Sequence, residues 1–268
     1  ERGDEYLVGM DAHTYKFEGG GAAVLGSIQP QPIVQADDGS LPLERIEAAI
    51  KPVDPHFART RLLALENTWH GRPLALDYLG AAHDLARKPG LGLHLDDARL
   101  FNAAVACGVP AREIARHFDS VSICLSKGLG APVGSVLVGS SVLVDKARRW
   151  RKVCGGGWRQ AGMLAAAGLH VLDHHVARLA DDHRRAAYLA GCLREIAGVD
   201  LLGQHTNMVF IDVPAARLRE LDVHLRSAGI RISIGYLPTL RLVTHLDIDD
   251  AGIERTVAAF REFFAARR

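Results

Sequence analysis

Short apolar runs alternate with amphipathic segments over the first two thirds of the chain. Apolar runs that end in polar residues are typical of buried strands, and apolar positions three or four residues apart are typical of helices. The pattern predicts strands over residues 6–9, 31–34, 61–65, 91–95, 121–125 and 133–139, and helices over 40–51, 77–88 and within 105–117. Such alternation indicates βαβ units, so we expect an α/β fold whose mainly parallel sheet has helices on both faces.

The pattern changes after the three glycines at 155–157. In residues 160–196 apolar positions recur at helical spacing almost throughout, and this pattern predicts two helices. Beyond them, short strands are predicted over 199–202, 208–213, 231–234 and 240–243, with helices over 215–228 and 249–266. We therefore expect a large domain over residues 1–170 and a smaller α+β domain over residues 171–268.

Composition excludes several classes of protein. Of the 268 residues 48% are apolar and 24% charged, close to an average globular chain, so disorder of the whole chain is not expected. The net charge of +1 gives no electrostatic argument for nucleic acid. No run of about 20 apolar residues predicts a membrane span, and no signal peptide is visible. Sparse cysteines outside any C-x-x-C pair suggest free thiols and a cytoplasmic location: Cys107, Cys124, Cys154 and Cys192.

A lysine directly follows one predicted strand. Lys127 comes two residues after the strand over 121–125 and is followed by Gly128 and Gly130. Burial at the end of such a strand disfavours the charged form of an amine and makes it a usable nucleophile, as a Schiff base requires. The ordinary alternative is a surface lysine in a strand-to-loop turn, and this segment alone leaves both readings open.

An aspartate ends the preceding predicted strand. Neighbouring parallel strands would bring Asp96 and Lys127 to the same edge of the sheet, where ligands bind in such folds. A carboxylate facing a pyridine nitrogen keeps that ring protonated and able to accept electrons, so this pair indicates pyridoxal 5'-phosphate (PLP). The alternative for Asp96 alone is an N-cap of the helix that starts near Ala98.

Taken together, these segments resemble the low-specificity L-threonine aldolases over nearly the whole chain. The run S-K-G-L-G-A-P-V-G-S from Ser126 to Ser135 is the most specific; His94–Arg99, Glu66–Thr68 and Leu240–Asp247 also match. The resemblance implies the PLP-dependent transferase type I fold. It further implies cleavage of L-threonine or L-allo-threonine to glycine and acetaldehyde, and a homo-oligomer organised as a dimer of dimers.

The same resemblance implies roles for four residues around the cofactor. Lys127 would bond the cofactor aldehyde, and Asp96 would pair with the pyridine nitrogen. Arg99 would lie near the 3-oxygen and the substrate, and His13 would stack on the pyridine ring and serve in catalysis. On local pattern alone, Arg99 is an exposed first-turn arginine and His13 a surface residue in a turn.

Two further residues would bind the substrate amino acid. Arg241 would hold the α-carboxylate, a task suited to a guanidinium, although an edge-strand charge is the plain alternative. His56 would contact the β-hydroxyl and act as a catalytic group, although its surroundings fit an ordinary loop. No metal is expected: no H-E-x-x-H motif occurs, and His174 and His175 are adjacent in a helical stretch and point to different sides.

The chain also departs from the family pattern. Asp97 stands where the family has glycine, and we expect its charge to act near the cofactor unless it points to solvent. Family members carry about 70 more N-terminal residues, with a loop at a helix N-terminus that cradles the phosphate. We find no equivalent and expect an N-terminally incomplete chain. The rival functions are a β-eliminating PLP lyase of the same superfamily and an impaired fragment that serves as a binding or subunit-interaction module.

Overall fold

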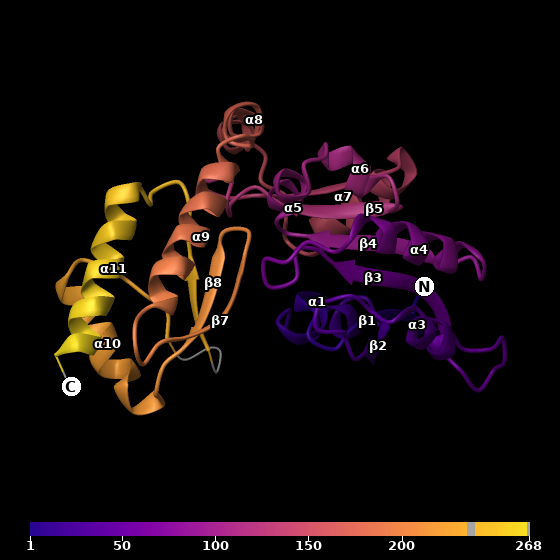
Figure 1. The fold of residues 1–268 in the computed structure, drawn as a ribbon. Coiled ribbons are helices and arrows are strands. Elements are labelled where there is room, and N and C mark those ends of the chain that lie inside the picture. Colours follow the sequence, from indigo (N-terminus) through magenta and orange to yellow (C-terminus); the bar gives the residue numbers. More distant parts are fainter. Residues whose placement is uncertain (235–238, 267–268) are drawn as a thin grey trace. The chain divides into compact units, whose positions relative to one another are not determined.

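The computed structural model describes residues 1–234 and 239–266. By their internal contacts the residues form two compact units (Figure 1). The first unit comprises Glu1–Lys127 and Ala131–His170, and the second comprises Gly128–Gly130 and Val171–Arg268. The short segment Gly128–Gly130, directly after Lys127, therefore belongs by its contacts to the second unit.

The first unit is built on a six-stranded sheet in the order β2-β1-β3-β4-β5-β6. All neighbouring pairs are parallel except β5 and β6, which are antiparallel. The mainly parallel α/β fold expected from the sequence is confirmed. The strands are β1 (Asp4–Gly9), β2 (Gln29–Ile33), β3 (Arg59–Glu66), β4 (Gly92–Asp97), β5 (Ser120–Cys124) and β6 (Ser135–Gly139).

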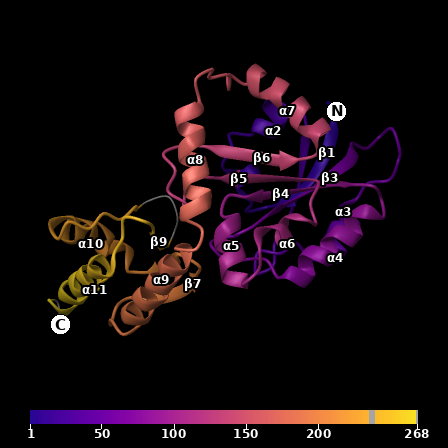
Figure 2. The same cartoon turned by 90° about the horizontal axis from the view of Figure 1, so that it is seen from above.

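Helices lie on both faces of this sheet (Figure 2). One face carries α3 (Leu43–Ala49), α4 (Leu76–Arg87), α5 (Leu100–Cys107) and α6 (Ala111–Ala115), whose apolar side chains pack against the strands in one core. The other face carries α2 (Gly21–Val24) and α7 (Ser141–Val153), and also α1 (His13–Lys16), whose Tyr15 packs against the cluster of Tyr6 and Val8. No residue of α7 is buried, so this second face is the more open one. The next helix, α8 (Gly162–His174), runs from the first unit into the second.

The second unit is an α+β structure. Its antiparallel sheet has the order β7 (Asp200–His205), β8 (Met208–Asp212), β9 (Leu240–Val243). The helices α9 (Leu179–Arg194), α10 (Ala215–Ser227) and α11 (Asp250–Ala265) complete it. Fully buried Leu193, Val209 and Phe260 belong to the core that these elements share.

Two sequence predictions differ from the structure. The helix predicted within residues 105–117 spans parts of two helices, because Gly108 takes a φ of +66° after α5 and Pro110 precedes α6. The strand predicted over 231–234 is wrong, since these residues have irregular backbone. Ile232 and Ile234 pack against the core of the second unit, so the alternating pattern reflects one-sided packing without strand pairing.

Three chemical features bear on function. All four cysteines are free thiols, as expected. Within residues 1–234 and 239–266, no helix is both long and apolar enough to cross a membrane. In the same part of the chain, no group of three or more His, Cys, Asp or Glu side chains is arranged to hold a metal ion.

Candidate active site

Polar side chains form a row across three strands near their carboxyl ends. Glu66 ends β3 and pairs in register with Asp96 of β4, which in turn pairs with Ser122 of β5. Residues paired in this way point to the same face of a sheet. The hydroxyl of Ser122 donates to Asp96 Oδ1 at 3.1 Å, which fixes one oxygen of that carboxylate. We call Glu66, Asp96 and Ser122 the polar row.

Asp97 points to the opposite face from Asp96. It continues the alternation of Leu93 and Leu95, which are buried under the helices of the first core, and its side chain is 0% exposed. Asn67 Nδ2 donates to Asp97 Oδ2 at 3.2 Å. Burial raises the pKa of Asp97 well above its ordinary value and favours the neutral carboxyl. The expectation of an added charge or a solvent-facing group is therefore wrong: Asp97 lies in the core.

Lys127 lies in the turn between β5 and β6, three residues after β5 ends at Cys124. It is exposed, so the burial expected from the sequence is wrong. The turn carries it beyond the end of the buried strand, and the adjoining strand β6 is itself exposed. The charge of Lys127 nevertheless lowers the pKa of Glu66. Lys127 therefore lies close enough to the polar row to act on it electrostatically.

The carboxyl of Glu66 in the polar row has a strongly raised pKa. Burial raises the pKa of Glu66 to about 7, and the nearby charge of Asp96 adds to the rise. The backbone N–H of His13 and the charges of Lys127 and Arg99 act in the opposite direction. The sequence analysis did not single out Glu66 as a site residue. The available signal was its place at the end of a predicted strand, one strand away from Asp96.

His13 is tied to the polar row through its backbone. Its N–H donates to Glu66 Oε2 at 2.6 Å, at the point where α1 begins. The His13 ring is half exposed, and its Nδ1 lies 2.7 Å from Glu18 Oε1. When a neutral ring donates from Nδ1 to a carboxylate, Nε2 is the acceptor. The first turn after β1 therefore offers a proton acceptor at the same edge as Asp96 and Lys127.

The structure does not bring His56 to this cluster within one chain. His56 lies in the loop before β3, its side chain is 86% exposed, and its Nδ1 is 2.7 Å from Asp54 Oδ1. Glu66 stands at the other end of β3, which has eight residues. At roughly 3.3 Å per residue, the first and last residues of that strand are about 23 Å apart.

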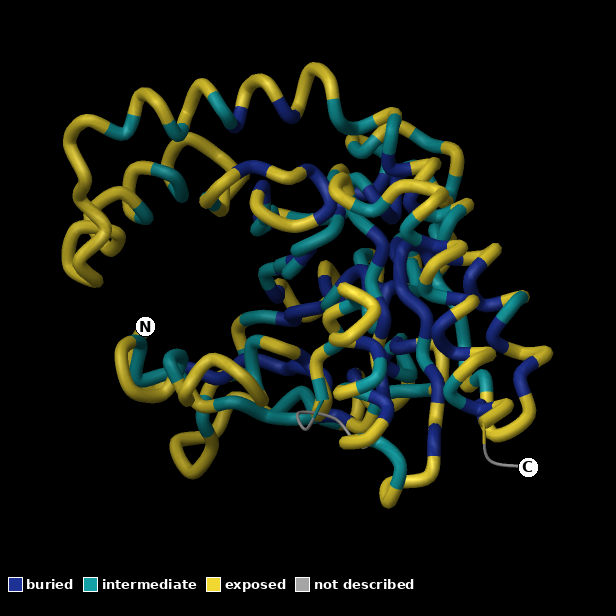
Figure 3. The backbone as a smooth tube through the Cα atoms, turned by 90° about the vertical axis from the view of Figure 1, so that its left-hand side faces the viewer, coloured by how far each residue is buried: buried dark blue, intermediate teal, exposed yellow. Residues whose placement is uncertain are grey.

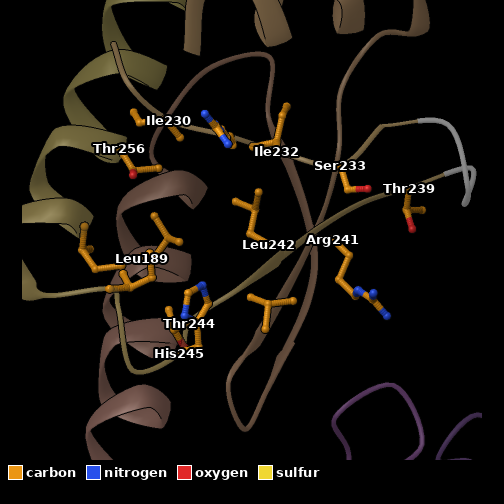
Figure 4. A pocket seen from close by; sticks show the side chains of 14 residues that line it. Leu189, Ile230, Ile232, Ser233, Thr239, Arg241, Leu242, Thr244, His245 and Thr256 are labelled. Carbon is orange, nitrogen blue, oxygen red and sulfur yellow. The ribbon is translucent and has the colours of Figure 1, made fainter. Parts of the chain in front are cut away.

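Arg241 belongs to the second unit. It is exposed on β9, next to the buried Leu242, and it lines a cavity of about 290 Å³. Figure 4 shows its side chain directed away from Leu189 and Thr256, which lie on the other side of that cavity. A guanidinium presented in this way can bind a carboxylate through two parallel hydrogen bonds.

The donor set at the sheet edge fits PLP. Lys127 supplies a primary amine that can bond an aldehyde, and Asp96 supplies a carboxylate already oriented by Ser122. Arg99, the N-cap residue of α5, supplies a guanidinium two residues after β4 ends. These are the groups that the aldehyde, ring nitrogen and 3-oxygen of the cofactor require.

Comparisons with known proteins agree with this chemistry. The family model described as "Beta-eliminating lyase" matches residues 1–216. The low specificity L-threonine aldolase of Escherichia coli (strain K12) is 51% identical over 99% of this chain and 79% of its own length. Low-specificity L-threonine aldolase 1 of Arabidopsis thaliana is 40% identical over 97% of this chain and 76% of its own length.

A solved structure shares the fold. Threonine aldolase of Leishmania major superposes with a TM-score of 0.79 and 20% identity, covering 98% of this chain and 78% of that chain. The likeness supports the PLP-dependent type I fold for the parallel sheet and its helices. On the sequence identities and the matching family model, the chain belongs to the PLP-dependent low-specificity L-threonine aldolases, within the β-eliminating lyase family.

Proposed function

We propose that this protein is a PLP-dependent lyase that cleaves L-threonine and L-allo-threonine to glycine and acetaldehyde. The observation that carries the proposal is the grouping of an amine, a carboxylate and a guanidinium at one edge of the sheet, where Lys127, Asp96 and Arg99 all act on Glu66. In a chain 51% identical to a low specificity L-threonine aldolase, this grouping supports cleavage of a β-hydroxy amino acid.

We assign the cofactor to the domain over residues 1–170. Lys127 would bond the aldehyde, Asp96 would hold the proton on the ring nitrogen, and Arg99 would contact the 3-oxygen. His13 would lie against the ring, on the α1 turn that Glu66 ties to β3. When bound, PLP supplies an electron sink for the carbon–carbon bond that breaks.

The chain's own side chains orient the substrate and move its proton. Arg241, in the domain over residues 171–268, binds the α-carboxylate, and Arg99 assists it. His13 takes the β-hydroxyl proton at Nε2, because its Nδ1 is engaged by Glu18. Fixing the carboxylate and the hydroxyl at the same time selects the Cα–Cβ bond for cleavage.

A β-eliminating lyase is the second candidate, favoured by the description of the matching family model. Incubation of the PLP-loaded protein with L-threonine tests the proposal, with acetaldehyde and glycine measured together and ammonia measured from L-serine and L-cysteine. We expect one acetaldehyde for each glycine and no ammonia. Ammonia without glycine would establish the β-eliminating function. Bound PLP without any product would leave only a binding or subunit-interaction module.

Replacing Arg241 with leucine is expected to raise the KM for L-threonine by about 10–100-fold. Hydrogen bonds to a charged group contribute about 1.5–3 kcal/mol, and each 1.36 kcal/mol corresponds to a factor of ten. The absorbance of bound PLP should not change, because Arg241 acts on the substrate. Arg241→Lys should lose less, since it keeps the charge. A fall in kcat with an unchanged KM would contradict the assignment.

Glu66 should give the enzyme a pH dependence near neutrality. Its pKa is about 7, so it is ionised above that pH and then accepts the His13 N–H most strongly. We expect kcat/KM to rise as the pH increases through about 7. In Glu66→Gln the amide oxygen accepts at every pH, so this rise should disappear. Glu47→Gln, at an exposed position of α3, is the control, and an unchanged profile in Glu66→Gln would refute the role.

We further propose that the chain forms a homo-oligomer, a dimer of dimers. No residue from 135 to 160 is buried. Figure 3 colours the backbone by burial, with exposed residues in yellow. This stretch includes Val136, Leu137 and Val138 of β6 and Trp150 of α7. Exposed apolar residues gathered in one stretch mark interaction surfaces. Within such an oligomer, His56 would serve the site of a second copy.

Mixing two inactive variants tests this sharing of sites. Lys127→Ala and His56→Ala chains are unfolded, combined and refolded together. Random pairing of equal amounts of the two chains makes half of the dimers mixed. If each site takes Lys127 from one chain and His56 from the other, each mixed dimer has one intact site of two. Activity should then return to about a quarter of the wild-type value. No return of activity, in a preparation where differently tagged chains co-purify, would show that the sites are not shared.

A cytoplasmic location is also proposed. The four free thiols support it, because cysteines stay reduced in that compartment. Fractionation of cells that produce the protein, with threonine cleavage as the readout, tests the proposal. Activity confined to an oxidising compartment would exclude it.

A further inference from the structure

The two backbone carbonyls that follow Lys127 are held by side chains from a distant part of the sequence. Arg178 Nη1 donates to the Gly128 carbonyl at 3.3 Å, and the Nδ1 of His175 donates to the Leu129 carbonyl at 2.6 Å. Both donors lie in the stretch that joins α8 to α9. Both contacts join Gly128–Gly130 to other residues of the second unit, to which this segment belongs.

Arg178 is itself fixed by a buried carboxylate. It forms an ion pair with Asp182 of α9, whose side chain is 0% exposed. Asp182 Oδ2 has no hydrogen-bond partner within residues 1–234 and 239–266. Burial raises the pKa of Asp182, and the charge of Arg178 is the first effect that opposes this rise. The guanidinium therefore holds Asp182 and the Gly128 carbonyl at once, as its rigid fork of donors permits.

The contacts continue to the end of β9. Thr244, the residue after β9, donates its hydroxyl to the Asp182 carbonyl at 2.7 Å. Asn207 Nδ2 donates to the Thr244 carbonyl at 2.8 Å, and both side chains are almost fully buried. A continuous path of polar contacts thus runs from Gly128 to the strand that carries Arg241. We call His175, Arg178, Asp182, Thr244 and Asn207 the loop network.

Without these contacts, the glycines of this loop would favour a flexible backbone. Glycine loses more conformational freedom on ordering than any other residue, and this loop has one at 128 and another at 130. Gly130 takes a φ of +82°, and a Cβ there would approach Leu246 Cδ2 at 3.2 Å. The Gly128 carbonyl lies in the peptide plane between Gly128 and Leu129, so fixing it restrains the backbone one residue beyond Lys127.

A stability role alone does not explain the network. Replacing a buried ion pair with apolar residues of similar volume is often neutral or stabilising. The donors of Arg178 and His175 instead reach backbone carbonyls of the one segment that follows the proposed cofactor lysine. This arrangement fits a role in fixing the backbone conformation of the segment after Lys127.

We propose that His175, Arg178 and Asp182 are positioning residues that hold the loop after Lys127 in register with the end of β9. Within the second unit, the network thereby fixes the segment that directly follows Lys127 to the end of the strand that carries Arg241. The inference rests on the proposed function in one respect, the bonding of PLP by Lys127. It also gives a function to His175, the second residue of the adjacent His174–His175 pair.

Matched variants separate positioning from folding. The double variant Arg178→Met with Asp182→Leu removes both charges together, so no buried charge is left unpaired. His175→Leu removes the other donor, whereas the side-chain amide of His175→Asn can stand where Nδ1 stood. His174→Leu is the control, because His174 is exposed at the end of α8. Circular dichroism checks that each variant is folded.

Two readouts on the full protein decide the proposal. Hydrogen exchange of the peptide over residues 126–132 should quicken by about tenfold in the double variant and in His175→Leu, the change expected for one lost hydrogen bond. The pH midpoint of the absorbance of lysine-bound PLP should shift in the same variants, and kcat should fall. His174→Leu should match the wild type, and His175→Asn should recover most of both signals.

The outcomes are distinct. Unchanged exchange in the folded variants would overturn the inference, and so would faster exchange with an unchanged PLP spectrum and kcat. A wild-type protein that carries no PLP on Lys127, as shown by borohydride reduction and mass spectrometry, would overturn the proposed function and this inference with it. A normal wild-type spectrum with unaffected variants would overturn the inference alone.

Discussion

Replacing Lys127 with alanine is expected to abolish threonine cleavage and the absorbance of lysine-bound PLP together. The exposed amine at the turn after β5 is the nucleophile that the proposal assigns to the cofactor aldehyde. Positioned reacting groups contribute effective concentrations on the order of 10⁵ M or more, so we expect a loss in turnover of at least about 10⁴-fold. Absorbance spectra with added PLP and the release of acetaldehyde are the measurements.

Two controls make the Lys127 result specific. Lys88→Ala, at an exposed position just after α4, should keep both the spectrum and the activity. A small primary amine added to Lys127→Ala should restore part of the turnover, because it supplies the missing group from solution. Retention of the lysine-bound spectrum in Lys127→Ala would show that another amine holds the cofactor.

The second large effect is expected for Asp96→Asn. An amide cannot balance a protonated ring nitrogen, so the cofactor would lose much of its capacity to accept electrons. Removing one partner of a desolvated charge pair costs about 3–5 kcal/mol, which corresponds to a loss in kcat of roughly 150–5,000-fold. Measurements of kcat and of PLP affinity in the purified variant test this expectation.

The neighbouring residue provides a matched control for Asp96. Asp97→Asn makes the same chemical change one position along β4, but Asp97 lies on the helix-covered face and is buried. Burial raises the pKa of its carboxyl well above the ordinary value and the side chain faces away from the polar row, so its replacement should leave kcat and PLP affinity almost unchanged. Equal effects of the two substitutions would contradict the assignment of Asp96 to the ring nitrogen.

The sequence predicted most of the framework on which these side chains stand. Apolar runs identified β3, β4 and β5, and the register of these strands in the structure places Glu66 beside Asp96. The fold was accessible because each of these strands is an apolar run with a clear polar end. Where one-sided packing imitates a strand, as at Ile232 and Ile234, pattern alone gave a wrong element.

The remaining features depend on three-dimensional contacts that a pattern does not contain. The pKa of Glu66 depends on burial and on four neighbours drawn from separate segments. Lys127 is exposed because the turn after β5 carries it beyond the end of that strand. His56 lies far from Glu66 because its loop precedes β3, whereas Glu66 ends that strand. The contact between His175 and Leu129 joins residues 46 positions apart, a separation that no periodicity reveals.

The core position of Asp97 has a consequence for how the protein responds to acid and alkali. In the folded chain burial raises the pKa of this carboxyl well above its ordinary value of 3.8, near which it ionises in the unfolded chain. Its contribution to stability is therefore full below that ordinary value and declines as the pH rises toward the folded pKa, so unfolding between the two values releases protons. A salt-bridged surface carboxylate behaves in the reverse way, because its contribution is lost on acidification.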